Sequence, residues 1–108
     1  MKTYKVRFTR KVYGQIESIA TYITSINTIE SSIRYVNSLI DETLTLSYCA
    51  DIIPRLQWKT PQVVYSKTKR LFVKKGKLTV FFVTYQNYVL IYDIVPSSLV
   101  TEESVFTP

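Results

Sequence analysis

The sequence contains no histidine and a single cysteine, Cys49. The lack of histidine removes the usual general base near neutral pH, the Ser-His and Cys-His nucleophile pairs, and most transition-metal sites. One cysteine cannot form an internal disulfide and cannot by itself build a zinc site. We therefore expect Cys49 to be a small buried residue, and we expect no metal and no cofactor. Any catalysis would have to use carboxylate, lysine, arginine or tyrosine side chains.

Long apolar runs are also lacking, because no stretch approaches the roughly 18 residues that a membrane-spanning helix needs. Residues 1–5 lead into an alternating pattern rather than a continuous apolar stretch, so the sequence predicts no signal peptide. A length of 108 residues and a hydrophobic content of 46% suit one folded domain. We expect a cytoplasmic protein without membrane contact, with one domain over residues 1–96 and a loosely ordered tail over residues 97–108.

Acidic residues are missing from one segment, and this concentrates the net charge of +6. Residues 1–54 have a net charge of +1 and residues 78–108 have −3, whereas residues 55–77 have +8. The eight cations of the middle segment are Arg55, Lys59, Lys67, Lys69, Arg70, Lys74, Lys75 and Lys77. Such a concentration favours a polyanionic partner, either nucleic acid or an acidic protein segment.

The first half of the chain predicts a strand followed by two helices. Residues 3–8 alternate between apolar and basic side chains, as in a half-buried strand. Thr9 can cap a helix that begins near Arg10, and apolar residues recur at helical spacing from residue 12 to residue 26. A second helix is predicted to begin near Asn27 or Thr28 and to extend to about residue 47, with Asn27 and Glu30 as a capping pair. Its apolar stripe is Ile29, Ile33, Val36, Ile40 and Leu44.

The second half predicts an irregular segment and three strands. Pro54 and Pro61 interrupt residues 50–66, where Trp58 either closes the loop over the core or serves as an exposed anchor. Strands are predicted over residues 70–74, 78–85 and 88–95, joined by tight turns at 75–76 and 86–87. We therefore predict an α+β fold of order β-α-α-β-β-β, with a helical hairpin packed on one face of a small antiparallel sheet.

This order resembles the RelE/ParE superfamily of bacterial toxins. The stretch 4–12, Tyr-Lys-Val-Arg-Phe-Thr-Arg-Lys-Val, looks like the family's first strand running into its first helix. Ile16, Ile19, Tyr22 and Ile23 match the helix pattern "L..I..YI". Residues 69–73, 78–83 and 89–95 resemble the family's triple-strand signature, so the match covers about residues 4–95.

The resemblance implies the toxin of a type II toxin–antitoxin pair, a bacterial growth inhibitor of the kind associated with plasmid stabilization. It also implies a protein antitoxin as partner, in a homodimer or in a hetero-oligomer with that antitoxin. The ParE-like branch binds DNA gyrase and blocks replication. The RelE-like branch cleaves mRNA in the ribosomal A site and would make this chain a metal-independent endoribonuclease.

Catalysis in the RelE-like manner needs cations around the scissile phosphate and groups that move protons. The candidate catalytic residues are Lys69, Arg70, Lys77 and Tyr85. Active members of the family place Arg, Lys, His or Tyr just after the last strand, whereas residues 96–101 are Pro-Ser-Ser-Leu-Val-Thr. This departure favours the ParE-like interpretation, with the RelE-like nuclease as the alternative.

The basic segment is the predicted binding surface for the target or for an acidic segment of the antitoxin. Its candidate residues are Lys67, Lys69, Arg70, Lys74, Lys75, Lys77 and Tyr88. An acidic segment could bind by packing in a groove and by adding a strand to the sheet. A further alternative is a small nucleic-acid-binding module without toxicity, in which tyrosines beside Lys74–Lys77 would stack on bases.

Overall fold

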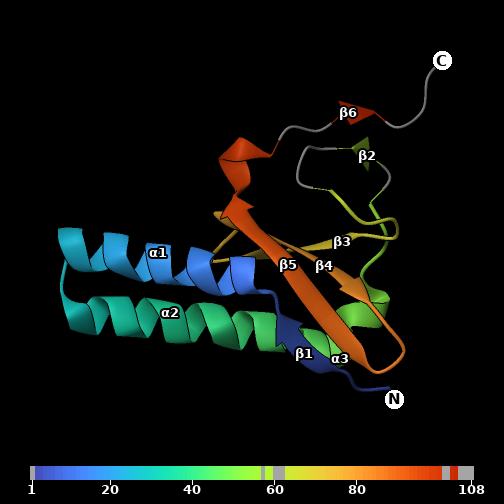
Figure 1. Cartoon of the computed structure of the whole chain (residues 1–108), viewed down its shortest axis with the longest axis horizontal. Coiled ribbons are helices and arrows are strands. Elements are labelled where there is room, and N and C mark those ends of the chain that lie inside the picture. Colours follow the sequence, from blue (N-terminus) through green and yellow to red (C-terminus); the bar gives the residue numbers. More distant parts are fainter. Residues whose placement is uncertain (1, 57, 60–62, 101–102, 105–108) are drawn as a thin grey trace.

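A computed structural model describes residues 2–56, 58–59, 63–100 and 103–104, with the last pair and residues 58–59 described by their backbone alone. Two long helices form a hairpin that lies on one face of a four-stranded sheet (Figure 1). The elements are β1 (Lys5–Phe8), α1 (Arg10–Ile26), α2 (Ile29–Leu44), α3 (Leu46–Cys49), η1 (Ala50–Ile52), β2 (Trp58–Lys59), β3 (Lys69–Val73), β4 (Leu78–Thr84), β5 (Tyr88–Pro96), η2 (Ser97–Leu99) and β6 (Glu103–Ser104). The predicted α+β fold and the order of its main elements are confirmed.

The sheet is mixed, and this corrects the expectation of an antiparallel sheet. Its strand order is β1-β5-β4-β3, in which β4 is antiparallel to both β3 and β5, and β1 is parallel to β5. The last three strands are joined by tight turns, which produce antiparallel pairs. β1 reaches the sheet through no such turn, and its alternating pattern fixes which face is buried but not the direction of its partner.

Thr9 ends β1 and starts α1, as the sequence predicted. Its side-chain oxygen accepts the backbone N–H of Val12 at 3.3 Å, and its own N–H donates to the carbonyl of Ile91 at 3.1 Å. The N-cap therefore also ties the start of the helix to the central strand β5. Val12 is fully buried beneath it, and Ile16 and Ile19 pack on the same core.

The second helix differs from its prediction in both its cap and its buried face. Thr28, not Asn27, is the N-cap, and its hydroxyl accepts the N–H of Ser31 at 3.1 Å. The fully or largely buried residues of α2 are Ser32, Leu39 and Thr43, whereas Ile29, Ile33 and Leu44 of the predicted stripe are exposed. The Ser32 hydroxyl donates to the carbonyl of Ala20 at 2.9 Å, so a small polar side chain lies buried between the two helices.

The outer half of the hairpin extends beyond the edge of the sheet (Figure 1). Tyr22, Ile26, Ile29 and Ile33 in this half expose more than half of their surface. The apolar stripes therefore meet the sheet only over the inner turns, where Val12 and Leu39 lie.

Two apolar clusters cover the two faces of the sheet. The first lies under the helices and includes Phe82, Ile91 and Leu39. The second lies on the other face, where Phe81 and Tyr92 pack against Leu56 and Val63 of the irregular segment. A bulge separates Phe81 from Phe82, because Phe81 pairs with Asp93 and Phe82 with Ile91. The extra residue in β5 is Tyr92, and the bulge turns Asp93 toward the start of α1.

No helix in the described ranges is long and apolar enough to cross a membrane. In the predicted loose tail, Ser97–Leu99 form η2 and Val100 packs against the Phe81 cluster, while residues 101–102 and 105–108 lie outside the described residues. β2 and β6 pair with each other through Trp58 and Ser104. Whether the indole of Trp58 closes the core also lies outside the described part of the chain.

Candidate functional site

The basic segment does not form one patch, because strand β3 divides it. Lys74, Lys75 and Lys77, which we call the turn cluster, lie in and beside the β3–β4 turn. Lys67, Lys69 and Arg70 lie at the other end of β3, where Lys69 pairs with Phe82. Lys69 and Lys74 are five residue steps apart along the extended chain, a span of roughly 16 Å. The predicted binding residues are therefore two groups at opposite ends of the edge strand of the sheet.

The turn cluster is held against α2 by Glu42. The backbone N–H of Lys74 donates to both carboxylate oxygens of Glu42, at 3.1 and 3.2 Å. Its ammonium group donates to the hydroxyl of Ser38 at 3.0 Å and lies 4.2 Å from the ring centroid of Tyr35. Lys74 is thus engaged by the protein itself. Lys75 and Lys77 line a shallow depression of about 330 Å³ beside it and are exposed to a partner.

The turn has an unusual backbone, since Lys74 (φ 53°), Lys75 (φ 58°) and Gly76 (φ 84°) all have positive φ. A side chain with a Cβ is disfavoured in this conformation by roughly 1 kcal/mol, which glycine avoids. We expect Lys75→Gly to stabilise the fold by about 0.5–1 kcal/mol, measured by urea unfolding. Lys77→Gly is the control, because Lys77 does not have a positive φ and should gain nothing. Equal effects at both positions would contradict a conformational cost at Lys75.

Lys69 points toward the helical side of the sheet. Its ammonium group donates to the carbonyl of Ala50 at 2.8 Å. Burial lowers the pKa of Lys69, the nearby Arg55 lowers it further, and the carboxylate of Asp51 opposes both. The next residue, Arg70, belongs to the other face, where its guanidinium lies 4.7 Å from the ring centroid of Phe72. Neighbouring residues of a strand point to opposite faces of the sheet. Lys69 and Arg70 therefore do not contact the same ligand atom.

The lowered pKa of Lys69 predicts a pH dependence of stability. Between the pKa of the folded state and the unfolded value near 10.5, the folded protein binds fewer protons at this site than the unfolded chain. Stability therefore rises with pH across this window. Compared with Lys69→Met, the wild type should gain free energy of unfolding between pH 7 and pH 10 in urea titrations. The contribution of the buried tyrosines to the pH dependence cancels in this comparison, because both proteins contain them. A difference that stays constant or moves the other way would contradict the assignment.

The four candidate catalytic residues do not converge on one point. Lys69 and Arg70 point to opposite faces, and Lys77 lies at the far end of β3. Tyr85 stacks on Tyr88 near the β4–β5 turn, with ring centroids 4.8 Å apart. General acid–base catalysis needs its groups within hydrogen-bond reach of one substrate position. The geometry of these four side chains does not provide that arrangement.

Tyr88 also lies away from the lysines expected beside it. It is at the start of β5, at the end of the sheet opposite the turn cluster, and the guanidinium of Arg7 lies 4.8 Å from its ring centroid. The expectation that tyrosines stack beside Lys74–Lys77 is therefore wrong, because those lysines follow β3 at its far end. The cation beside Tyr88 is Arg7 of β1. This contact follows from the parallel pairing of β1 with β5, in which Lys5 lies opposite Tyr88.

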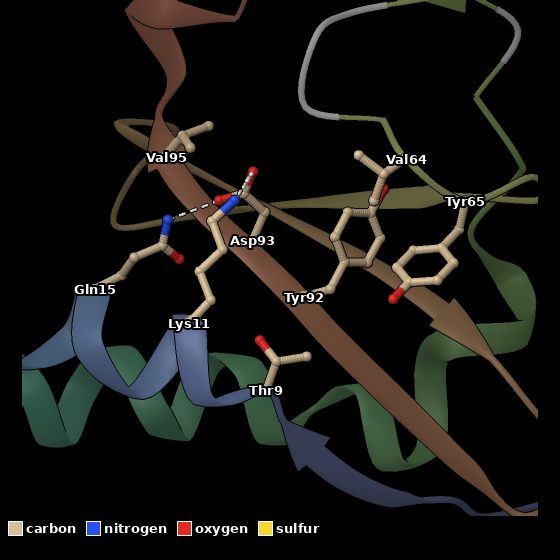
Figure 2. A pocket seen from close by; sticks show the side chains of 8 residues that line it. All are labelled: Thr9, Lys11, Gln15, Val64, Tyr65, Tyr92, Asp93 and Val95. Carbon is tan, nitrogen blue, oxygen red and sulfur yellow. Dashed lines mark hydrogen bonds and ion pairs between the residues drawn. The ribbon is translucent and has the colours of Figure 1, made fainter.

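The structure also contains a cleft that the sequence did not indicate. It has a volume of about 510 Å³ and lies between the start of α1, strand β5 and the irregular segment (Figure 2). Its floor is polar, with Lys11, Gln15 and Asp93, and its wall is formed by Val64, Tyr65, Tyr92 and Val95. The rings of Tyr65 and Tyr92 meet edge to face, with centroids 4.7 Å apart.

Gln15 makes the central contacts of this cleft. Its Nε2 donates to Oδ1 of Asp93 at 2.7 Å, and its Oε1 accepts the backbone N–H of Ile94 at 2.9 Å (Figure 2 shows the first). β1 pairs with β5 only up to Ile91, so the following part of β5 has a free edge. The carboxamide of Gln15 takes the place of a neighbouring peptide group there. Lys11 is 64% exposed and lies 3.5 Å from the buried Asp93 carboxylate. This ion pair therefore contributes little to the stability of the fold.

Tyr92 closes the other side of the cleft. Its hydroxyl and that of Thr68 are 2.8 Å apart, and Thr68 donates its only proton to the carbonyl of Tyr65 at 2.6 Å. Tyr92 is therefore the donor in this pair. Burial raises the pKa of Tyr92 above the ordinary value for tyrosine. Among the described residues, no group of three histidine, cysteine or carboxylate side chains is placed to hold a metal ion.

The architecture defines a class, a helical hairpin packed on a small mixed sheet. No protein-family model matches the chain, and no curated protein matches it. Among solved structures, the chain is similar to one from "Chromosomal ParDE TA system from P. aeruginosa", with a TM-score of 0.71. The sequence identity is 14%, and the match covers 87% of this chain and 96% of that chain. The two chains share a fold, and this agrees with the fold that the sequence resemblance implied.

Proposed function

We propose that this protein is the toxin of a type II toxin–antitoxin system, and that it inhibits growth in the ParE-like manner by occupying a macromolecular target, with DNA gyrase as the candidate. The likeness to a chain of a ParDE system over nearly the full length of both chains carries the proposal. The separation of Lys69, Arg70, Lys77 and Tyr85 supports occupancy over catalysis. The residues after β5, Ser97–Leu99, offer no cation or phenol either.

An acidic segment of the antitoxin is the proposed neutralising partner. β3 is the outer strand of the sheet in the order β1-β5-β4-β3, so its free edge can pair with an added strand. A segment on this edge would run from the Lys67–Arg70 end to the turn cluster, and carboxylates near both of its ends would meet cations. The division of the basic segment by β3 thus suits an extended acidic partner better than a compact one.

The test is to induce this chain alone in a bacterial host and to follow DNA synthesis and mRNA integrity from the first minutes. Growth should stop, DNA synthesis should fall before mRNA is fragmented, and the purified chain should inhibit supercoiling by gyrase. Ribosome-dependent mRNA cleavage would replace the proposal with the RelE-like nuclease. Normal growth with no effect on gyrase would contradict toxicity altogether.

Two double variants test the turn cluster in a separate binding assay with the antitoxin. Lys75→Gln with Lys77→Gln removes the two exposed cations of the turn, whereas Arg10→Gln with Arg34→Gln removes two exposed charges from the helices. Only the first pair should weaken capture of a co-expressed acidic antitoxin encoded by the neighbouring reading frame. Equal capture by both pairs would show that the turn does not contribute to neutralisation.

A further inference from the structure

A stack of one arginine and two tyrosines lies on the sheet near the β4–β5 turn. The guanidinium of Arg7 is 4.8 Å from the ring centroid of Tyr88. The ring of Tyr88 in turn stacks on that of Tyr85, with centroids 4.8 Å apart and an angle of 23° between the planes. β5 lies between β1 and β4, so Tyr88 has Arg7 on one side and Tyr85 on the other. The three planar groups therefore form a ladder across three neighbouring segments.

The ladder belongs to the sheet face that points away from the helices. Val6 and Phe8 of β1 pack on the core beneath the helices, so the alternate residues, Lys5 and Arg7, lie on the opposite face. Lys5 pairs with Tyr88, and paired residues of neighbouring strands share a face. The described residues Leu56 and Val63 of the irregular segment pack on this face against the cluster of Phe81 and Tyr92.

The outer member of the ladder is open to a ligand. Tyr85 is 42% exposed although one side of its ring rests on Tyr88. Lys5 and Arg7 are also exposed, as are the two turn residues Gln86 and Asn87. Residues 2–9 contribute three cations and residues 84–90 none, and neither stretch contains a carboxylate. The surface thus combines a partly exposed aromatic ring, exposed cations and amide groups.

These features match the chemistry of single-stranded nucleic acid. Unpaired bases stack on aromatic rings and on arginine planes, while cations follow the phosphates. In a duplex the faces of the bases are already stacked on one another and cannot reach Tyr85. We propose that the Arg7–Tyr88–Tyr85 ladder is a binding site for single-stranded nucleic acid. One base stacks on the free face of Tyr85, and phosphates contact Lys5 and Arg7. This site is separate from the turn cluster and does not depend on the toxin proposal.

Fluorescence anisotropy with the full chain tests the site, with labelled dT12, rU12 and a 12-base-pair DNA duplex as probes. The single strands should bind more tightly than the duplex, and their affinity should fall steeply as salt rises, because counterions are released. Comparison of dT12 with rU12 distinguishes DNA from RNA as the ligand. Tyr85→Ala should weaken single-strand binding by about tenfold or more, whereas Tyr85→Phe keeps the stack and should bind nearly normally.

Arg7→Gln should also weaken binding and reduce the slope of affinity against salt by about 0.7 for the lost phosphate contact. The control is Arg34→Gln, which removes one exposed cation from α2 and should leave dT12 binding within about twofold. Equal affinity for duplex and single strand, an unaffected Tyr85→Ala protein, or a loss of binding in the Arg34→Gln protein as large as that in Arg7→Gln would each overturn the proposal. Circular-dichroism melting verifies that every variant is folded. Growth arrest is scored separately, so failure here leaves the toxin proposal standing.

Discussion

Gln15→Leu should lower the free energy of unfolding by about 2–4 kcal/mol, although leucine suits a helix and has a similar size. The substitution removes the acceptor of the Ile94 N–H and the Nε2 donor to Asp93. A backbone donor and a carboxylate that is 3% exposed then each lose a hydrogen-bond partner. In a domain of this length the midpoint of thermal unfolding should fall by roughly 10–20 °C.

Lys11→Ala is the matched control, because it removes the other partner of Asp93 one helical turn earlier. Lys11 is largely exposed and 3.5 Å from the carboxylate, so its loss should cost less than about 1 kcal/mol. Gln15→Glu adds a second test, because it keeps an acceptor for Ile94 but places two carboxylates side by side. Its destabilisation should shrink as the pH falls and the pair comes to share a proton. A Gln15→Leu protein as stable as the Lys11→Ala protein would show that this bridge does not hold α1 to β5.

Phe82→Ala should lower the free energy of unfolding by about 3–5 kcal/mol, because removing a large buried side chain leaves a cavity in the core. Phe82 is fully buried beneath the helices, where it packs with Leu39 and Ile91. The matched control is Phe72→Ala in the neighbouring strand, since Phe72 is 51% exposed and contacts the guanidinium of Arg70. Its loss should cost under about 1 kcal/mol. Denaturant unfolding of both proteins measures the difference, and similar costs would contradict the assignment of the two faces.

The sequence predicted the elements well because their signals are local. Alternation identified β1, helical spacing and Thr9 identified α1, and the Lys75–Gly76 turn separated β3 from β4. Each signal depends on neighbours within a few residues, where backbone geometry fixes which side chains share a face. The same local signals failed for α2, where apolar Ile29 and Ile33 are exposed and polar Ser32 is buried. Hydrophobicity does not reveal that a hydroxyl can be satisfied by the facing helix, as Ser32 is by Ala20.

The candidate sites depended far more on contacts between distant segments. The sequence located the positive charge and predicted one patch. In the structure the extended strand β3 separates the cations into two groups, one at each of its ends. Gln15 and Asp93 are 78 residues apart in the chain, and their contact exists only because β1 ends early and β5 continues. Arg7 meets Tyr88 only because β1 joins the sheet parallel to β5.

By itself, therefore, the sequence determined that this chain forms two helices and a small sheet in this order, and that it carries a strongly basic stretch. Periodicity, caps and turns encode those features within short windows of the chain. The tertiary structure alone decided which face of α2 is buried, how β1 enters the sheet, and which cations and rings come together. These outcomes depend on strand direction and on the ends of strands, which no short stretch of residues specifies.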